Sequence, residues 1–218
     1  MRHLLTFDSP VMTYLSLLKD WIVLSLLWVL CSLPVITIGV STTALYYVTL
    51  KMVRHEAGSV VRNFFKAFKE NFKQGLTLGV ILLICGGILL VDSMYFSGMG
   101  GTKGIIMTVL FYSVTASFAC MVCYVFPFMA QFSNTIPGML KSAVYLAARN
   151  LPSTILILFL NGLPIWVRLL SFEVFMRMLP LWICMAPAAV AHVCSLRFVK
   201  IFAPVIQSIQ ERQKQTTA

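Results

Sequence analysis

Five stretches of the chain contain no Asp, Glu, Lys or Arg, and each is long enough to cross a lipid bilayer. They are residues 21–50, 74–91, 104–140, 150–167 and 178–196. A helix needs about 20 apolar residues to span the hydrocarbon core, and a backbone within lipid must satisfy its hydrogen bonds internally. The stretches therefore predict an all-α polytopic membrane helix bundle, a single domain over residues 1–218.

The composition agrees with this prediction. Apolar residues make up 59% of the 218 residues and charged residues 11%, against roughly 45–50% and about 25% in soluble domains. A water-soluble domain of this size cannot bury so much apolar surface, so a soluble globular protein is excluded. All six cysteines lie in apolar stretches, where they act as small hydrophobic residues, and no disulfide framework is expected.

The first and third stretches are too long for one straight span. Pro34 interrupts helical hydrogen bonding within residues 21–50, so we expect either one helix kinked near Pro34 or a re-entrant hairpin. In the third stretch, Pro137 and Gly138 follow the span, and residues 139–150 fit a short amphipathic helix at the membrane surface. The predicted spans are 21–50, 74–91, 104–132, 150–167 and 178–196.

Lys and Arg are distributed unevenly between the predicted loops. One side carries Lys51, Arg54, Arg62, Lys66, Lys69, Lys73, Lys141, Arg149, Arg197, Lys200, Arg212 and Lys214. The other side carries Arg2, Lys19, Lys103, Arg168 and Arg177. Because cytoplasmic loops carry the excess of Lys and Arg, we expect the N-terminus outside and the C-terminus in the cytoplasm. The net charge of +10 reflects this topology, and no nucleic-acid-binding module accompanies it.

Residues 59–73 (SVVRNFFKAFKENFK) predict an amphipathic helix on the cytoplasmic side. At 100° per residue, Phe65, Phe68 and Phe72 fall within about 60° of one another. A row of cations flanks this aromatic stripe: Arg62, Lys66, Lys69 and Lys73. Such a helix can insert its rings among anionic lipid headgroups or bind a partner protein, and both interpretations use the same residues.

Few strongly polar side chains lie within the predicted spans. Asn161 and His192 are the candidates for an intramembrane site, because polar groups in a membrane often mark a transport pathway. The alternative role for each is a hydrogen bond between helices. No paired carboxylates and no catalytic motif occur, so we expect no enzymatic activity, no catalytic residue, no metal ion and no cofactor.

Residues 31–75 contain a series of motifs: C-S-L-P, T-I-G, T-A-L-Y-Y-V-T-L-K-M-V-R and F-F-K-x-F-K-x-N-F-K-Q. They resemble the YesL-like family of bacterial integral membrane proteins, a domain of unknown function. The chain length, the five spans and an N-L-P-S-T segment at the start of the fourth span are also similar. Besides the aromatic and basic helix, the shared motifs contain Pro34, Gly39, Tyr46, Tyr47, Lys51 and Arg54.

The resemblance implies a role in sugar uptake in the bacterial plasma membrane. Genes of this family commonly lie beside those of carbohydrate ABC importers, which implies a non-enzymatic accessory or regulatory subunit for oligosaccharide uptake. We expect membrane lipids and the importer's permease subunits as partners, with residues 59–73 as the contact surface. The alternative is an autonomous small-solute transporter or channel, with Asn161 and His192 lining a path.

Overall fold

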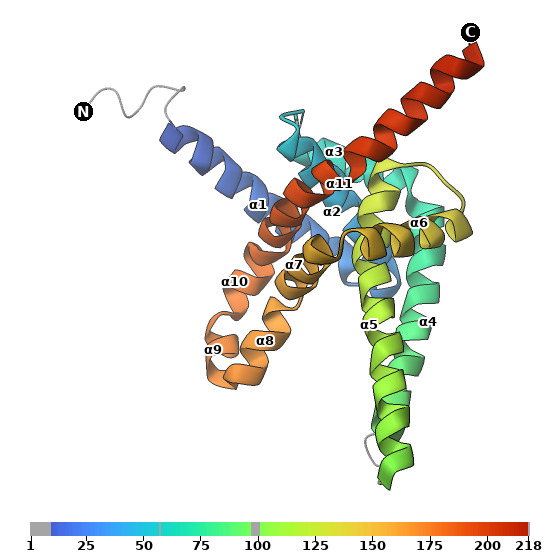
Figure 1. Cartoon of the computed structure of the whole chain (residues 1–218). Coiled ribbons are helices and arrows are strands. Elements are labelled where there is room, and N and C mark those ends of the chain that lie inside the picture. Colours follow the sequence, from blue (N-terminus) through green and yellow to red (C-terminus); the bar gives the residue numbers. More distant parts are fainter. Residues whose placement is uncertain (1–9, 57, 97–100, 218) are drawn as a thin grey trace.

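The computed structural model describes residues 10–56, 58–96 and 101–217, and the regular elements within them are helical. The first half contains α1 (Pro10–Ser32), the 3-10 helix η2 (Val35–Thr37), α2 (Ile38–Val53), α3 (Val60–Glu70), α4 (Phe72–Phe96) and α5 (Gly101–Gln131). The second half contains α6 (Ile136–Arg149), α7 (Leu151–Asn161), α8 (Leu163–Leu170), α9 (Phe172–Arg177), α10 (Leu179–Cys184) and α11 (Ala186–Thr217). The protein is an all-α polytopic helix bundle, which confirms the predicted fold class (Figure 1).

The helix α2 is the centre of the bundle, and α3, α4, α5 and α11 pack around it. Tyr46 of α2 meets Phe198 of α11 edge to face, with ring centroids 5.7 Å apart. Phe198 also meets Tyr124 of α5 at 5.2 Å. A polar contact joins Thr49 Oγ1 and Ser195 Oγ, which lie 2.8 Å apart in the buried interface of α2 and α11. The core is thus mainly apolar and aromatic.

The first apolar stretch forms two helices instead of one kinked span over 21–50. The helix α1 ends before Pro34, which cannot donate a backbone hydrogen bond. Thr37 Oγ1 donates to the carbonyl oxygens of Cys31 and Pro34, each at 2.6 Å, and so holds the turn. Tyr14 near the start of α1 and His55 just after α2 line one cavity. The two helices therefore form an antiparallel hairpin. Each is long and apolar enough to cross a membrane, so the hairpin differs from both the single kinked span and the re-entrant hairpin that were predicted.

Within the described residues, five helical segments are long and apolar enough to cross a membrane. They are Tyr14–Ser32, Val35–Val53, Phe72–Tyr95, Gly104–Gln131 and Ala186–Glu211. The helices α6 and α7, bent by 106° relative to each other, add a sixth if they count as one broken span. Several apolar helices could therefore span a membrane, as expected for a multi-pass protein.

The predicted spans 150–167 and 178–196 are each divided in two. The first forms α7 and α8, and the second forms α10 and the beginning of α11. Pro164 and Pro187 lie just after the two breaks, and neither can supply the N–H that would continue the helical hydrogen-bond ladder. By contrast, α4 and α5 include nearly all of the predicted spans 74–91 and 104–132.

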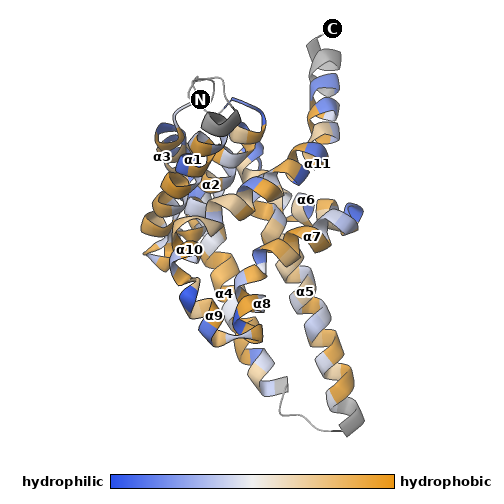
Figure 2. Ribbon diagram, turned by 90° about the vertical axis from the view of Figure 1, so that its left-hand side faces the viewer, coloured by the Kyte–Doolittle hydropathy of each residue, from blue (hydrophilic) through white to orange (hydrophobic). Residues whose placement is uncertain are grey.

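The beginning of α1 and the end of α11 lie at the same end of the bundle as α3 (Figures 1 and 2). This arrangement favours the start of α1 and the end of α11 on one side of the membrane, whereas we predicted the two chain ends on opposite sides. The prediction counted residues 21–50 as one crossing, whereas α1 and α2 run in opposite directions. Asp20 of α1 lines the same cavity as His55, which follows α2. Arg2 lies outside the described residues.

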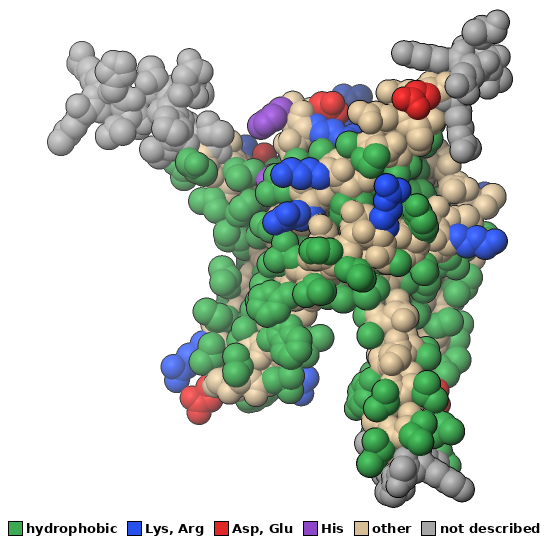
Figure 3. All heavy atoms as spheres, in the orientation of Figure 1, with side chains coloured by type: hydrophobic (Ala, Val, Ile, Leu, Met, Phe, Trp, Pro, Cys, Tyr) green, Lys and Arg blue, Asp and Glu red, His purple; other side chains and the backbone are tan. Residues whose placement is uncertain are grey.

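Charged and apolar side chains are separated along the bundle. In Figure 3 most Lys and Arg side chains of the visible face gather over the half that holds α3, and hydrophobic side chains cover the limb formed by α4 and α5. Ile88, Leu90 and Val109 on this limb are among its exposed apolar residues. An exposed apolar surface of this kind suits contact with lipid or with another membrane protein.

Candidate functional site

The helix α3 is fixed to the bundle by one buried face. Val60, Phe64 and Ala67 lie in the hydrophobic core, and Phe64 and Ala67 are completely buried. This face packs on α2 and α1. Phe64 also stacks on Phe68, with ring centroids 6.2 Å apart. The helix is therefore preformed on the bundle, and its opposite side is presented in a fixed position.

The predicted aromatic stripe is only partly a surface. Phe65 and Phe72 are 41% and 40% exposed, and Val61 is 43% exposed. Phe68 is partly buried and packs against Phe72 at 5.7 Å, so it contributes to the support of the surface. Phe64 was not among the predicted site residues. The adjacent phenylalanines at 64 and 65 could have indicated its buried position. Neighbouring helical residues point about 100° apart, so only one of the two rings can lie on the exposed stripe.

A row of cations borders the exposed rings. We refer to the following exposed residues as the α3 edge: Val61, Arg62, Phe65, Lys66, Lys69, Phe72 and Lys73. Lys66 Nζ lies 3.9 Å from Glu70 Oε1, and both side chains are more than half exposed, so this ion pair adds little stability. Among the described residues, Arg62, Lys69 and Lys73 make no ion pair. Their charges are therefore available to an anionic group outside the chain.

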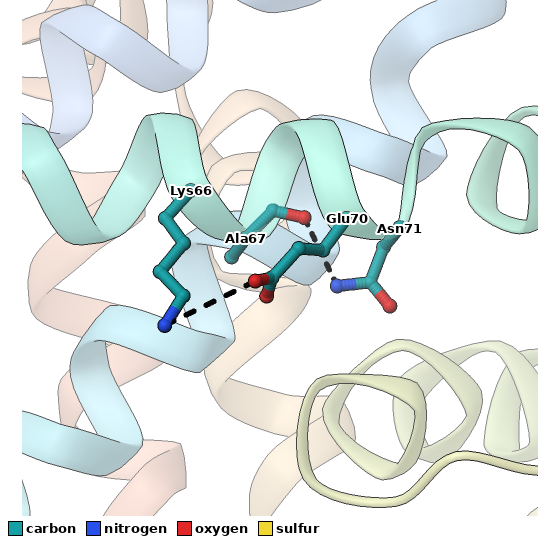
Figure 4. A network of polar contacts seen from close by, with 4 residues as sticks. All are labelled: Lys66, Ala67, Glu70 and Asn71. Atoms are coloured by element: carbon teal, nitrogen blue, oxygen red, sulfur yellow. Dashed lines mark hydrogen bonds and ion pairs between the residues drawn. The ribbon is translucent and has the colours of Figure 1, made fainter.

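The α3 edge is formed by two helices instead of the single helix predicted over residues 59–73. The helix α3 ends at Glu70, and Phe72 begins α4. Asn71 separates them, and its Nδ2 donates to the carbonyl oxygen of Ala67 at 2.9 Å (Figure 4). The backbone N–H of Asn71 donates to the same carbonyl at 3.0 Å. A short side chain that bonds to the local backbone competes with the helical ladder, which explains the end of α3 at this residue.

The residues of the shared motifs support the neighbouring helices. Tyr46 is buried in the core, and Lys51 Nζ lies 4.7 Å from the centre of the Tyr47 ring, a cation–π arrangement. The backbone N–H of Arg54 donates to the carbonyl oxygens of Leu50 and Lys51 at 3.2 Å each and closes α2. Pro34 begins the turn before α2, and Gly39 lies at the crossing of α2 and α4. These contacts place α2 and, through it, α3.

The structure does not bring Asn161 and His192 together. Asn161 Nδ2 donates to the carbonyl oxygen of Ile157 at 2.8 Å and lines a cavity with Tyr46. The His192 ring packs on Trp21, with ring centroids 5.5 Å apart, and lines a different cavity beside His55. The two side chains therefore do not line a common path in this conformation.

Among the comparisons with known proteins, one family model matches the chain, and the match lies in its first half. No curated protein and no solved structure matches the chain. The matched segment, residues 21–93, contains most of α1 and α4 and all of α2 and α3, and so it includes the antiparallel hairpin and the whole α3 edge. Over these residues the chain matches the model of a family described as "Protein of unknown function, DUF624".

Proposed function

We propose that this protein is a non-enzymatic accessory subunit that supports oligosaccharide uptake by a carbohydrate ABC importer of the bacterial plasma membrane. The resemblance of residues 31–75 to YesL-like proteins motivates the choice of importer. The observation that carries the docking role is the α3 edge, where exposed aromatic rings lie beside Arg62, Lys69 and Lys73, which make no ion pair among the described residues.

The α3 edge suits a protein partner because it is rigid before binding. Phe64 and Ala67 hold α3 on the bundle, so a partner need not order this helix, and the entropic cost of association is reduced. Aromatic residues and Arg are enriched at the centres of protein interfaces. The cations favour a partner surface rich in Asp and Glu.

The distribution of Lys and Arg supports a cytoplasmic position for the α3 edge. The half of the bundle that holds α3 contains Lys19, Lys51, Arg54, Arg62, Lys66, Lys69, Lys73, Lys141, Arg149, Arg197, Lys200, Arg212 and Lys214. Lys103, Arg168 and Arg177 lie towards the other end. By the positive-inside rule, the α3 half is cytoplasmic, and so are the beginning of α1 and the end of α11. The α3 edge would then face the side on which the importer's ATPase binds.

The limb formed by α4 and α5 offers a second, membrane-embedded contact. A Cβ atom added to Gly87 would meet no other atom within 4 Å, and one added to Gly86 would meet only Phe118, at 3.7 Å. Small residues let membrane helices approach closely. A permease helix could therefore pack on this side of α4 while the α3 edge binds at the membrane surface.

The proposal is tested by recovering complexes from the native bacterium in mild detergent. The variant is Phe65→Ala with Lys69→Glu, both on exposed positions of α3. The matched control is Tyr145→Ala with Lys141→Glu, an exposed aromatic and an exposed cation on α6 in the same half of the bundle. We expect permease and ATPase subunits to copurify with the natural protein and with the control, and at least tenfold less with the α3 variant.

Uptake of labelled oligosaccharides by the same cells provides the functional measurement. The α3 variant should reduce the initial uptake rate at an unchanged amount of membrane-inserted protein, and the control should not. The proposal is wrong if the natural protein copurifies with no importer subunit, or if both variants behave alike. Solute flux through the purified protein in liposomes would instead support the autonomous transporter, although Asn161 and His192 line separate cavities.

A further inference from the structure

A cavity of about 460 Å³ lies between the first half of α1, the end of α2 and the first half of α11. The polar side chains of its wall are Tyr14, Ser16, Asp20, His55 and His192. Aliphatic and methionine side chains from the three helices complete the wall. Asp20 is the one carboxylate among the described lining residues, and no Lys or Arg lines the cavity there.

The Asp20 carboxylate has no partner of its own. It lies in Tyr14–Ser32, a segment long and apolar enough to cross a membrane, and it is half-buried. It makes no ion pair or hydrogen bond within the described residues. Its oxygen atoms are also not among the buried side-chain atoms without a partner, so they keep accessible surface. An ionisable group in such a segment is costly and typically marks a functional site.

Basic residues of the chain lie near the cavity but do not enter it. Lys19 and Arg54 are the sequence neighbours of Asp20 and His55, yet neither lines the cavity. The half of the bundle that holds α3 is rich in Lys and Arg, and Asp20 still has no cation beside it. A carboxylate that is partly removed from water is stabilised by a positive charge. The open space beside Asp20 can receive that charge from outside the chain.

The wall favours an organic cation over a metal ion. Within the described part of the chain, no group of three His, Cys, Asp or Glu side chains could hold a metal ion, whereas a hard cation such as Ca²⁺ takes about 6–8 oxygen ligands. The aliphatic part of the wall would contact a hydrocarbon chain, and the exposed ring of Tyr14 is of a kind that attracts ammonium groups.

The two imidazoles of the wall can take part in binding while they are neutral, because each then has one nitrogen that accepts a hydrogen bond. His55 is exposed. The Nδ1 atom of His192 is buried without a partner, so His192 can meet a ligand only through Nε2. The carboxylate of Asp20 therefore supplies the charge, and the imidazoles supply weaker polar contacts.

We propose that this cavity binds an organic ammonium ion, with the charged group against the Asp20 carboxylate and the hydrocarbon part against Leu17, Val53 and Leu196. A free alkylamine and the ethanolamine headgroup of a lipid share this chemistry. The inference does not depend on an importer, because the site lies within this chain alone.

Isothermal titration calorimetry tests the proposal on the purified full-length protein in dodecyl maltoside. The probe is hexylammonium chloride, and the heat of the same titration into protein-free micelles is subtracted. The comparison probe is 1-hexanol, which has the same chain but no charge. We expect saturable binding of one hexylammonium ion per chain, with an affinity about tenfold or more above that of the alcohol, which corresponds to about 1.4 kcal/mol.

A pair of charge-removing variants tests the role of Asp20. Asp20→Asn should weaken hexylammonium binding by about tenfold or more, and Asp20→Glu, which keeps the charge, should bind more tightly than Asp20→Asn. The matched control is Asp92→Asn, because Asp92 is also half-buried and also lies in a candidate membrane span, but does not line the cavity. This control should bind hexylammonium as the natural protein does.

A second pair of variants places the ligand in the cavity. Leu196→Phe adds bulk to an exposed lining residue of α11, and Val193→Phe adds bulk to an exposed residue of the same helix that does not line the cavity. Because both positions are exposed, both variants should fold. The first should weaken binding and the second should preserve it.

Heat that does not saturate, equal affinities for hexylammonium and hexanol, or equal losses in Asp20→Asn and Asp92→Asn would each overturn the proposal. Short-chain phosphatidylethanolamine distinguishes the two sources of the ligand. If this lipid competes with hexylammonium, the site takes a lipid headgroup. If hexylammonium binds equally well in its presence, the site takes a free amine.

Discussion

Gly39 of α2 lies against Gly79 of α4 with no side chain between the two backbones. A Cβ atom added to Gly39 would lie 2.9 Å from the Cα atom of Gly79 and 2.7 Å from the carbonyl oxygen of Gly75. Both neighbours are backbone atoms, so neither can rotate away. This crossing joins the central helix to the limb of α4 and α5, and it depends on glycine in both helices.

We therefore expect Gly39→Ala to destabilise the protein by about 1–3 kcal/mol, the usual cost of inserting atoms into a packed interior. The matched control is Gly87→Ala in α4, where the added methyl meets no atom within 4 Å and alanine favours the helix by about 1 kcal/mol. Thermal unfolding in detergent should show a lower Tm for Gly39→Ala and an equal or higher Tm for Gly87→Ala. Equal losses in both variants would contradict a tight crossing at Gly39.

The adjacent phenylalanines of α3 should differ sharply in their effect on stability. Phe64 is completely buried and Phe65 is 41% exposed. We expect Phe64→Ala to cost about 3–5 kcal/mol, as for other buried aromatic residues, and Phe65→Ala to cost much less. The measurement is chemical or thermal unfolding followed by circular dichroism. If the two losses are the same, α3 is not held by the face that contains Phe64.

The fold class could be predicted from the sequence because a lipid environment imposes long apolar helices, and charge-free stretches reveal them directly. Pro34 was identified as a break, but a proline shows only where hydrogen bonding stops. The direction of the following helix depends on contacts such as that of Gly39 with Gly79, which are remote in sequence. The structure therefore divides residues 21–50 between α1 and α2, where one kinked span was predicted. The side of the membrane on which the N-terminus lies stays a prediction.

For the candidate surface on α3, the helical projection predicted neighbouring rings and cations but not how the helix packs on the bundle. A helical projection places Phe65 and the cations side by side, yet it cannot show which flank packs on α2. Phe64 and the break at Asn71 were therefore missed. The cavity lined by Tyr46 and Asn161 could not be predicted at all. Its walls combine residues as distant in sequence as Trp28 and Trp182, and no local spacing links them.

The orientation can be tested by labelling single introduced cysteines with a membrane-impermeant thiol reagent. We choose the exposed positions Tyr14 and His55 in the α3 half and Glu173 in α9 at the other end. In intact cells, Glu173→Cys should react, whereas Tyr14→Cys and His55→Cys should react only after permeabilisation. Labelling of Tyr14→Cys in intact cells would restore the threading with an external N-terminus and would remove α1 from the cytoplasmic half.

Anionic lipid should also bind at the α3 edge if the helix lies at the cytoplasmic membrane surface. Adding phosphatidylglycerol to the protein in neutral detergent should raise its Tm, because a ligand that binds the folded state stabilises it by mass action. Lys69 and Lys73 are exposed and make no ion pair among the described residues, so Lys69→Gln with Lys73→Gln should reduce this increase. Salt at 1 M should do the same in the natural protein, because it shortens the screening length to about 3 Å.

The matched control for this lipid experiment is Lys141→Gln with Arg149→Gln, which also removes two positive charges from the α3 half but leaves the α3 edge intact. The control should keep most of the increase in Tm caused by phosphatidylglycerol. An equal loss in both double variants would mean that the lipid responds only to the total charge of this half. The local arrangement of rings and cations on α3 would then have no specific role in lipid binding, because two charges placed elsewhere would serve equally well.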